Sequence, residues 1–262
     1  MTNDFDIKKI AESGQCFRID PFGENAYLAI AGNKYCKITC DGEIITSKSD
    51  FNAFWHDYFD FSTDYAAIRS SIDPKDSFLT SAAEYGEGIR ILRQDPWEML
   101  ITFIISQRKN IPAIKSCVNT LAEKYGSVIG EEDGKKIFAF PTPAQLAAVN
   151  IEDLKRCSLG YRDQYVHEAA LSVFRGNIDL EALSEKSDEE LYQSLLSLKG
   201  VGPKVANCIL LFGFHRIAAF PIDVWIKRVI DEIYDGSFPL EKYAGYAGII
   251  QQYMFFYGKS IL

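Results

Sequence analysis

The sequence lacks an uninterrupted apolar run of the roughly 18 residues that a membrane-spanning helix needs. Its polar beginning, MTNDFDIKKIAESGQ, also lacks the apolar centre of a secretory signal peptide. These two absences argue against a membrane protein and against secretion. We therefore expect an intracellular, cytoplasmic protein.

The six cysteines show neither a metal-ligand spacing nor the four-cysteine pattern of an iron–sulfur cluster. Cys36 and Cys40 are the nearest pair, and a separation of four places both on one face of a strand. Because no histidine or second cysteine pair stands beside them, packing is their expected role. We predict reduced thiols and neither a metal nor another cofactor.

Positive charge is also scarce, since 28 Lys and Arg stand against 36 Asp and Glu, for a formal net charge of −8. Proteins that coat nucleic acid through bulk electrostatics usually carry a basic surplus, so that class is disfavoured. A net charge sums the whole surface, however. A few backbone amides at a helix N-terminus, together with a short basic loop, can still bind phosphate locally.

What the chain has in quantity is material for a core, with 47% hydrophobic and 13% aromatic residues in a length of 262. The stretch AYLAIAGNKYCKITCDGEIITS alternates short β-type runs with turns at Gly32-Asn33 and Asp41-Gly42, which predicts an antiparallel meander. From about Phe51 the apolar spacing becomes helical. We predict an α+β fold: an N-terminal antiparallel β domain with some helices over residues 1–80, packed on a mainly α-helical body over residues 81–262.

The segment from residue 94 to residue 126 predicts two helices with a polar interruption. Asp95 is a good N-cap, and Pro96 suits the first helical position of a buried helix. The interruption, SQRKN, places Arg108 and Lys109 in a loop that can face an anion, although such a loop alone is usually a solvated turn. Two further segments, 174–183 and 234–243, are interpreted as loops.

The stretch LKGVGPKVANCI (198–209) joins two amphipathic helices into a predicted helix-hairpin-helix over residues 188–213. Ser187 and Glu190 form a capping box before the first helix, and Pro203 opens the second. Gly200 and Gly202 carry no Cβ, so the amides of the turn can approach a phosphate closely. The pattern therefore favours binding to a DNA backbone over an αα-corner whose glycines only close the turn.

Lys204 stands at the first turn of the second helix, where the positive end of the helix dipole disfavours an ammonium. A lysine must be neutral to act as a nucleophile, so this placement suits a reactive amine, with Cys208 on the same helix face. The alternative is an exposed lysine that merely begins a helix. Asp223, in FPIDVW, is by default an N-cap, but a carboxylate held ionised there would also stabilise positive charge developing on a sugar.

These features resemble the helix-hairpin-helix Gly/Pro…Asp superfamily of DNA base-excision glycosylases, in which an aspartate follows the hairpin, here 19 residues after the lysine. Lysine at the joint marks members that cut the glycosidic bond and then the strand. Further stretches are similar to the 8-oxoguanine DNA glycosylases and run in that family's order. They are SGQCFR (13–18), LRQDPWEMLITFIIS (92–106), LGYRDQYV (159–166) and YAGIIQQYMFF (246–256).

The resemblance implies that Lys204 attacks C1′ of the damaged nucleotide, that Asp223 stabilises the sugar charge, and that β-elimination then breaks the strand. It further implies that the flipped base lies between Cys208 and an aromatic ring, while its edge and its N7 hydrogen are read by an amide and a backbone carbonyl. These base contacts are the ring of Phe255, the amide of Gln251 and the carbonyl of Gly14. Gln251 and Phe255 are four apart and share a helix face, which is also expected of plain packing.

By the same resemblance Tyr161 wedges into the DNA stack, Arg162 contacts the estranged base, and residues 108–110 contact DNA. The chain also departs from the family. Arg108 replaces an asparagine that fills the gap left by the flipped base, with Asn110 aligned in register. Ala113 replaces an arginine found where cytosine is strictly preferred, and Trp225 replaces a common histidine. We therefore expect weaker discrimination of the opposite base.

Three functions remain open from the sequence. The first is a bifunctional 8-oxoguanine DNA glycosylase and lyase, which the resemblance favours. The second is a related glycosylase for alkylated bases, against which Lys204 argues, and the third is a catalytically silent DNA-binding module, for which loss of Lys204 or Asp223 would be expected. The expected partner is double-stranded DNA containing 8-oxoguanine, not a membrane, and a monomer is expected, at the nucleoid if the source is bacterial.

Overall fold

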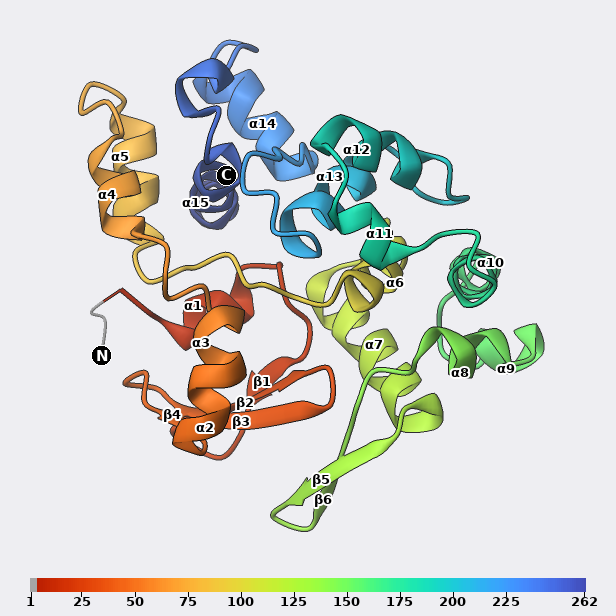
Figure 1. Ribbon diagram of the computed structural model, residues 1–262. Coiled ribbons are helices and arrows are strands. Elements are labelled where there is room, and N and C mark those ends of the chain that lie inside the picture. Colours follow the sequence, from red (N-terminus) through yellow and green to blue (C-terminus); the bar gives the residue numbers. More distant parts are fainter. Residues whose placement is uncertain (1–3) are drawn as a thin grey trace.

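The computed structural model describes residues 4–262 and begins with a small antiparallel sheet (Figure 1). Its strands pair in chain order, as the meander prediction required, and Ala29 lies opposite Cys36. The turn glycine of the first predicted hairpin, Gly32, has a φ of +57°, which suits a residue without a Cβ. The strands are β1 (Ile19–Pro21), β2 (Ala26–Ala31), β3 (Lys34–Thr39) and β4 (Ile44–Ile45).

One face of this sheet packs against short helices in a core of its own. These are α1 (Ile7–Glu12), the π-helical turn η1 (Phe51–Trp55) and α3 (His56–Tyr58). The short helix α2 (Lys48–Asp50) directly precedes η1, and its Asp50 pairs with Lys34 of β3. Alternation along β2 and β3 buries Cys36 in this core, as predicted. The packing role expected for Cys40 is wrong, because β3 ends at Thr39 and Cys40 lies exposed in the following turn.

The rest of the chain is mainly helical, which confirms the α+β prediction. The two segments interpreted as loops each contain a short helical element, α11 and η2, so that interpretation is wrong in part. The elements are α4 (Tyr65–Ser70), α5 (Ser77–Tyr85), α6 (Pro96–Ser106), α7 (Ile111–Tyr125), β5 (Val128–Glu132), β6 (Lys135–Phe138), α8 (Pro143–Ala147), α9 (Ile151–Lys155), α10 (Arg162–Phe174), α11 (Leu180–Ser184), α12 (Asp188–Leu196), α13 (Pro203–Phe212), α14 (Val224–Ile233), the 3-10 helix η2 (Leu240–Tyr243) and α15 (Ala247–Ile261).

Helix α6 is the central helix of the helical body. Asp95 caps it by accepting a hydrogen bond from the Glu98 amide at 2.8 Å, as the sequence predicted. Every residue from Trp97 to Ile105 is buried, and the ring of Phe103 stacks on Phe212 of α13 with centroids 5.4 Å apart. The predicted buried helix is confirmed, and it connects the hairpin helix to the core.

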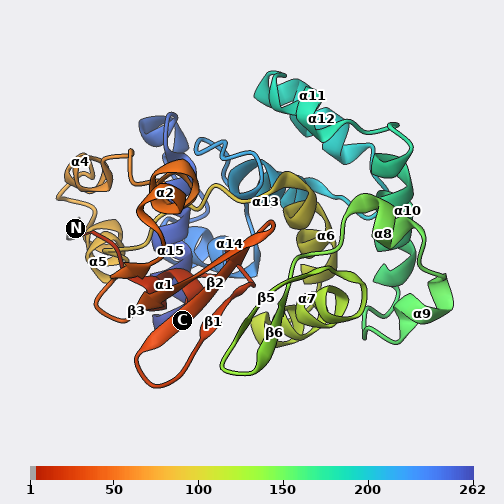
Figure 2. The same cartoon turned by 60° about the horizontal axis from the view of Figure 1, so that its bottom comes forward.

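Helices α4 and α5 contribute to the helical body, because Tyr65, Leu79 and Ala82 belong to its hydrophobic core. In both views α5 lies beside α15 (Figures 1 and 2).

The β5–β6 hairpin contacts the N-terminal sheet, because Glu132 of β5 forms an ion pair with Lys37 of β3 (Figure 2). A domain boundary near residue 80 stays a prediction. Among residues 4–262 no helix is both long and apolar enough to cross a bilayer.

Candidate active site

The predicted glycine hairpin lies between α12 and α13. Ser187 and Glu190 form the capping box at the start of α12, and Pro203 is the first residue of α13. Gly200 has a φ of +84°, and a Cβ built on it would come within 2.5 Å of the Tyr165 ring. A Cβ on Gly202 would meet nothing within 4 Å, so the backbone at the start of α13 is open to a ligand.

A cavity of about 360 Å³ opens beside this hairpin. Its wall combines segments far apart in the chain: the loop after α1, the C-terminal end of α6, the first turn of α7, and helices α13, α14 and α15. Most of the wall is apolar, with few polar groups, as is typical of small-molecule sites. Residues 13, 14, 103, 106, 110, 111, 204, 208, 223, 225, 251 and 255 are among those that line it.

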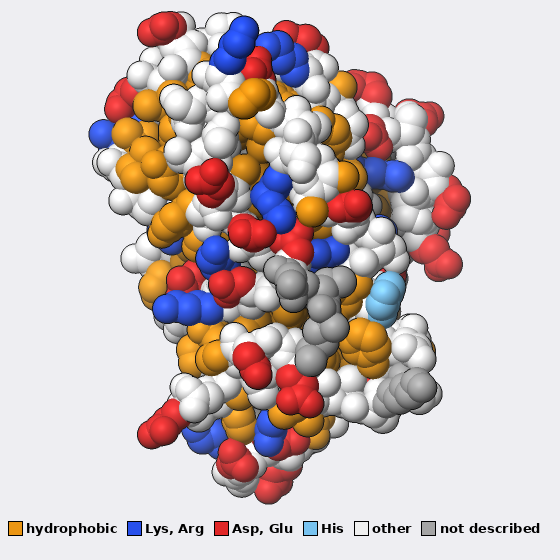
Figure 3. Space-filling model, turned by 90° about the vertical axis from the view of Figure 1, so that its left-hand side faces the viewer, with side chains coloured by type: hydrophobic (Ala, Val, Ile, Leu, Met, Phe, Trp, Pro, Cys, Tyr) orange, Lys and Arg blue, Asp and Glu red, His pale blue; other side chains and the backbone are white. Residues whose placement is uncertain are grey.

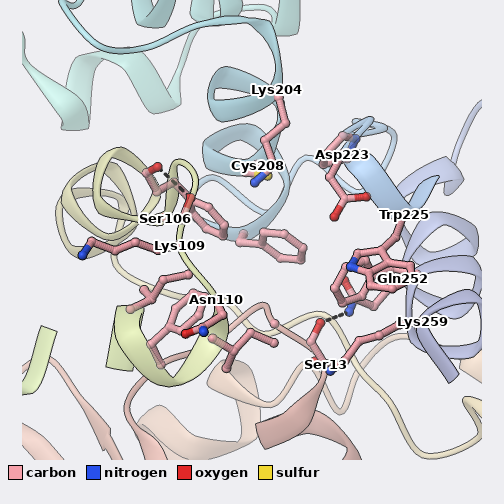
Figure 4. Close-up of a pocket in the computed structure, with 18 of the residues that line it drawn as sticks. Ser13, Ser106, Lys109, Asn110, Lys204, Cys208, Asp223, Trp225, Gln252 and Lys259 are labelled. Carbon is pink, nitrogen blue, oxygen red and sulfur yellow. Dashed lines mark hydrogen bonds between the residues drawn. The ribbon is translucent and has the colours of Figure 1, made fainter. Parts of the chain in front are cut away.

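Lys204 and Asp223 face this cavity from two different elements (Figure 4). Lys204 is the second residue of α13, is half-buried, and has its Nζ 5.4 Å from the centre of the Phe103 ring. Cys208 lies one turn further along α13, where burial raises the pKa of its thiol and nearby Lys204 partly opposes this. The sequence prediction that these groups share one site is consistent with this geometry.

Asp223 is the N-cap of α14, accepting a hydrogen bond from the Ile226 amide at 2.8 Å. Burial raises the pKa of the Asp223 carboxyl above its ordinary value of 3.8, while the Ile226 amide and Lys204 lower it. The expectation from the sequence was that the helix N-terminus keeps the Asp223 carboxyl ionised, which would lower its pKa. Burial acts in the opposite direction and has the larger effect.

The three residues expected to contact a base lie together at the other side of the cavity. Gly14 has a φ of +75°, and a Cβ there would lie 3.3 Å from the Phe255 ring. Gln251 and Phe255 project from one face of α15, one turn apart, and both line the cavity. Gln251 is 4% exposed, and its Oε1 is buried without a hydrogen-bond partner among residues 4–262. An unpaired buried acceptor beside a cavity is suited to a ligand with an N–H group.

The three predicted DNA contacts in the loop between α6 and α7 differ from one another in exposure and in hydrogen bonding. Arg108 is exposed, with a φ of +50°, and lines an adjoining cavity of about 750 Å³ that Lys204 and Asp223 also border. Lys109 borders both cavities and donates from Nζ to the Ser158 carbonyl at 2.9 Å. Asn110 caps α7 by accepting from the Ala113 amide at 2.9 Å, a structural role that the sequence did not predict.

Tyr161 is 53% exposed, as a wedge residue requires, but Arg162 is only 6% exposed. The Arg162 guanidinium donates to the Leu159 carbonyl at 3.0 Å and to the Gln107 carbonyl, and it lies 4.3 Å from the centre of the Tyr161 ring. Arg162 therefore points inward in this structure. Contact with a DNA base stays a prediction and requires the guanidinium to leave these carbonyls.

Several polar residues of the cavity have no role predicted from the sequence, among them Ser13, Gln252 and Lys259. Ser13 and Gln252 each stand next to a residue with a predicted role, and Lys259 lies beyond the family-like stretch 246–256. One signal was available for Lys259, since it continues the four-residue spacing of Gln251 and Phe255 along α15. Among residues 4–262 no group of three or more His, Cys, Asp or Glu side chains is arranged to hold a metal.

A glycine hairpin beside a cavity that is lined by an amine and a half-buried carboxylate is typical of the class of helix-hairpin-helix base-excision proteins. Residues 101–237 match the family described as HhH-GPD superfamily base excision DNA repair protein. Residues 1–100 match the 8-oxoguanine DNA glycosylase N-terminal domain. The chain belongs to the HhH-GPD superfamily, in its 8-oxoguanine glycosylase branch.

Solved structures of this branch are similar over almost the whole chain. An 8-oxoguanine glycosylase/lyase from Clostridium acetobutylicum, bound to DNA with cytosine opposite 8-oxoguanine, is 36% identical with a TM-score of 0.92, covering 98% of this chain and 92% of that one. MBOgg1, bound to a low-affinity DNA ligand, is 38% identical with a TM-score of 0.92, covering 98% and 93%.

Among curated relatives, the N-glycosylase/DNA lyase of Saccharomyces cerevisiae is 35% identical over 162 residues. These residues make up 58% of this chain but only 43% of the yeast protein, so the chain spans less than half of that relative.

Proposed function

We propose that this chain is a bifunctional DNA glycosylase and lyase that removes 8-oxoguanine from duplex DNA in base-excision repair. The observation that carries the proposal is the half-buried amine of Lys204, which faces an apolar cavity together with the Asp223 carboxyl (Figure 4). The activities printed for the Clostridium and yeast relatives support it. The proposed partner is double-stranded DNA, bound by a monomer in the cytoplasm.

A damaged base inside a duplex is out of reach of this cavity, so the nucleotide must be flipped out. The open backbone at Gly202 and the first turn of α13 supply amides for the adjacent phosphates. In the proposed complex Tyr161, which is exposed, inserts into the stack and offsets part of the unstacking cost. The base would then lie between Cys208 and Phe255.

In the first chemical step the neutral amine of Lys204 attacks C1′ and the C1′–N9 bond breaks, its electron pair leaving with the base. The Asp223 carboxylate stabilises the positive charge that develops on the sugar. Loss of a proton from the Lys204 nitrogen and opening of the sugar ring give a Schiff base. Removal of a proton from C2′ then breaks the bond between C3′ and the 3′ phosphate oxygen, which cuts the strand.

Recognition of the base rests on two acceptors in the cavity wall. The Gly14 carbonyl accepts the N7–H of 8-oxoguanine, whereas guanine presents a lone pair there and is repelled. The unpartnered Oε1 of Gln251 accepts an N–H from the base edge.

Borohydride trapping on a duplex with 8-oxoguanine tests the proposal, with Lys204→Gln in parallel. We expect a covalent adduct with the wild-type chain and none with the variant, also in EDTA, because the proposed steps use no metal. Base release without an adduct would instead indicate a monofunctional glycosylase, such as one for alkylated bases. Binding without release would indicate a silent module.

The loop after α6 and the first turn of α7 predict a relaxed choice of the opposite base, because Arg108 in the loop and Ala113 in the helix replace the family's asparagine and arginine. Single-turnover excision from duplexes that pair 8-oxoguanine with each of the four bases measures this preference. We expect cytosine to be favoured by less than about a hundredfold, which is roughly the discrimination of two good base contacts. A stronger cytosine preference contradicts this prediction.

A further inference from the structure

We infer that Gln252 is a positioning residue that orients the Gly14 carbonyl and thereby sets the discrimination between 8-oxoguanine and guanine. This inference rests on the proposed function and adds the device that holds the reading carbonyl in place. Gln252 neighbours Gln251 on α15 but points to the loop after α1, where its Nε2 donates to the Ser13 carbonyl at 2.6 Å (Figure 4).

The carbonyls on both sides of Gly14 are held by buried glutamine amides. Gln252 binds the Ser13 carbonyl, and Gln94 donates from Nε2 to the Gln15 carbonyl at 2.9 Å. Among residues 4–262 no hydrogen bond uses the carbonyl of Gly14 itself. Of three consecutive carbonyls, the outer two therefore accept hydrogen bonds from buried glutamines, while the middle one belongs to Gly14, which lines the cavity.

The side chain of Gln15 ties the same loop to the segment before α6. Its Nε2 donates to the Ser13 hydroxyl at 3.0 Å and to the Arg90 carbonyl at 2.9 Å, and its Oε1 accepts from the Leu92 amide at 2.9 Å. Gln15 is 0% exposed and Gln252 is 2% exposed. Water has little access to these groups, so losing a partner leaves a buried polar atom unpaired.

Gly14 needs such a restraint because glycine is the residue least confined by its own side chain. Its φ of +75° is one of several backbone conformations that glycine reaches at little cost. Gly14 lines the cavity, and a peptide rotation at this position would change the direction of its carbonyl. Hydrogen bonds to the carbonyls of Ser13 and Gln15 restrict that rotation, because the backbone on both sides of Gly14 is then anchored.

Gln252 holds the Gly14 loop from the same helix, α15, that carries two of the proposed base contacts. Gln251 and Phe255 belong to the same helix and contact the base edge and the base face in the proposed complex. A hydrogen bond from Gln252 to Ser13 fixes the distance between that helix and the Gly14 loop. The three parts of the base site are thereby kept in register.

The test compares Gln252→Met, which keeps the side-chain length but removes the donor, with the wild-type chain. The affinity is measured for duplexes carrying 2′-fluorinated 8-oxoguanine or 2′-fluorinated guanine nucleotides, which resist excision. Strand cleavage at a preformed abasic site is measured in parallel, because that reaction needs Lys204 but no base recognition. Leu146→Ala, a buried change in α8 away from the cavity, controls for general loss of stability.

We expect Gln252→Met to lower the ratio of 8-oxoguanine affinity to guanine affinity by about tenfold, as loss of one buried hydrogen bond predicts, with abasic-site cleavage unchanged. Leu146→Ala should leave the ratio as it is. If Gln252→Met does not fold, the test uses Gln94→Met, which removes the hydrogen bond on the other side of Gly14, and we expect the same fall in the affinity ratio. An unchanged ratio in the folded variant, or a ratio that falls only together with abasic-site cleavage, overturns the inference.

Failure of the proposed function is visible in the wild-type chain alone, as the absence of any preference for 8-oxoguanine. That result overturns both proposals. A wild-type preference that survives in Gln252→Met and Gln94→Met overturns only the role of Gln252.

Discussion

Asp223 has two tasks that make different demands on its charge. As the N-cap of α14 it needs only an acceptor oxygen, which asparagine supplies equally well. In the proposed reaction it must be ionised to stabilise a positive sugar. We predict that Asp223→Asn keeps the fold and lowers single-turnover excision by about a hundredfold or more, as loss of an electrostatic contact to a transition state does. A variant that excises at the wild-type rate contradicts the assigned role.

The raised pKa of Asp223 gives this prediction a pH dependence. Protonation of Asp223 favours the folded state, so the group contributes stability below its ordinary pKa of 3.8, and this contribution is lost as the pH rises through the folded-state value. Excision has the opposite slope and falls as the carboxylate is protonated. We expect the melting temperature of Asp223→Asn to equal or exceed that of the wild-type chain at pH 7. The difference should shrink towards pH 4, as thermal melts across this range will show.

At the scale of elements, the two glycines of the hairpin differ in backbone conformation and in the space around them. Gly200 has a positive φ and lies against Tyr165, whereas Gly202 has a φ of −98° and open space around it. We predict that Gly200→Ala lowers stability by about 1–2 kcal/mol or more and weakens DNA binding with it. Gly202→Ala should melt like the wild-type chain yet bind an abasic-site duplex more weakly, because its methyl group faces the phosphates. Equal effects of the two changes on the melting temperature would disprove this division.

Helix starts that are marked by a capping residue or a proline were predictable from the sequence. The capping box at Ser187, the N-cap at Asp95 and the proline that opens α13 all act locally, within one helical turn. Helix α11 was not predictable, because five residues are too few to show a helical period. It is capped by Asp179, a residue that equally signals a turn.

At the scale of the whole molecule, the acidic surplus limits how DNA is bound. On the face shown in Figure 3, acidic, basic and apolar side chains are intermixed. With a net charge of −8, we expect binding to depend on a few cations and on helix amides. We predict a slope of log affinity against log salt shallower than about 5, where a strongly basic binder reaches about 10. Lys109→Gln should reduce the slope by about one unit in an anisotropy titration, and a slope near that of a basic binder contradicts the prediction.

The sequence by itself determined the fold class, the hairpin and the residue types of the site, because these depend on short-range spacing and on motifs that run in one family's order. Lys204 with Cys208, and Gln251 with Phe255, share helix faces through spacing alone. Only the tertiary structure decided the rest. It brought the loop of Gly14 against α15, buried Asp223 enough to raise its pKa, and turned Arg162 inward. These outcomes depend on contacts between segments far apart in the chain, and the local spacing of residues does not predict such contacts.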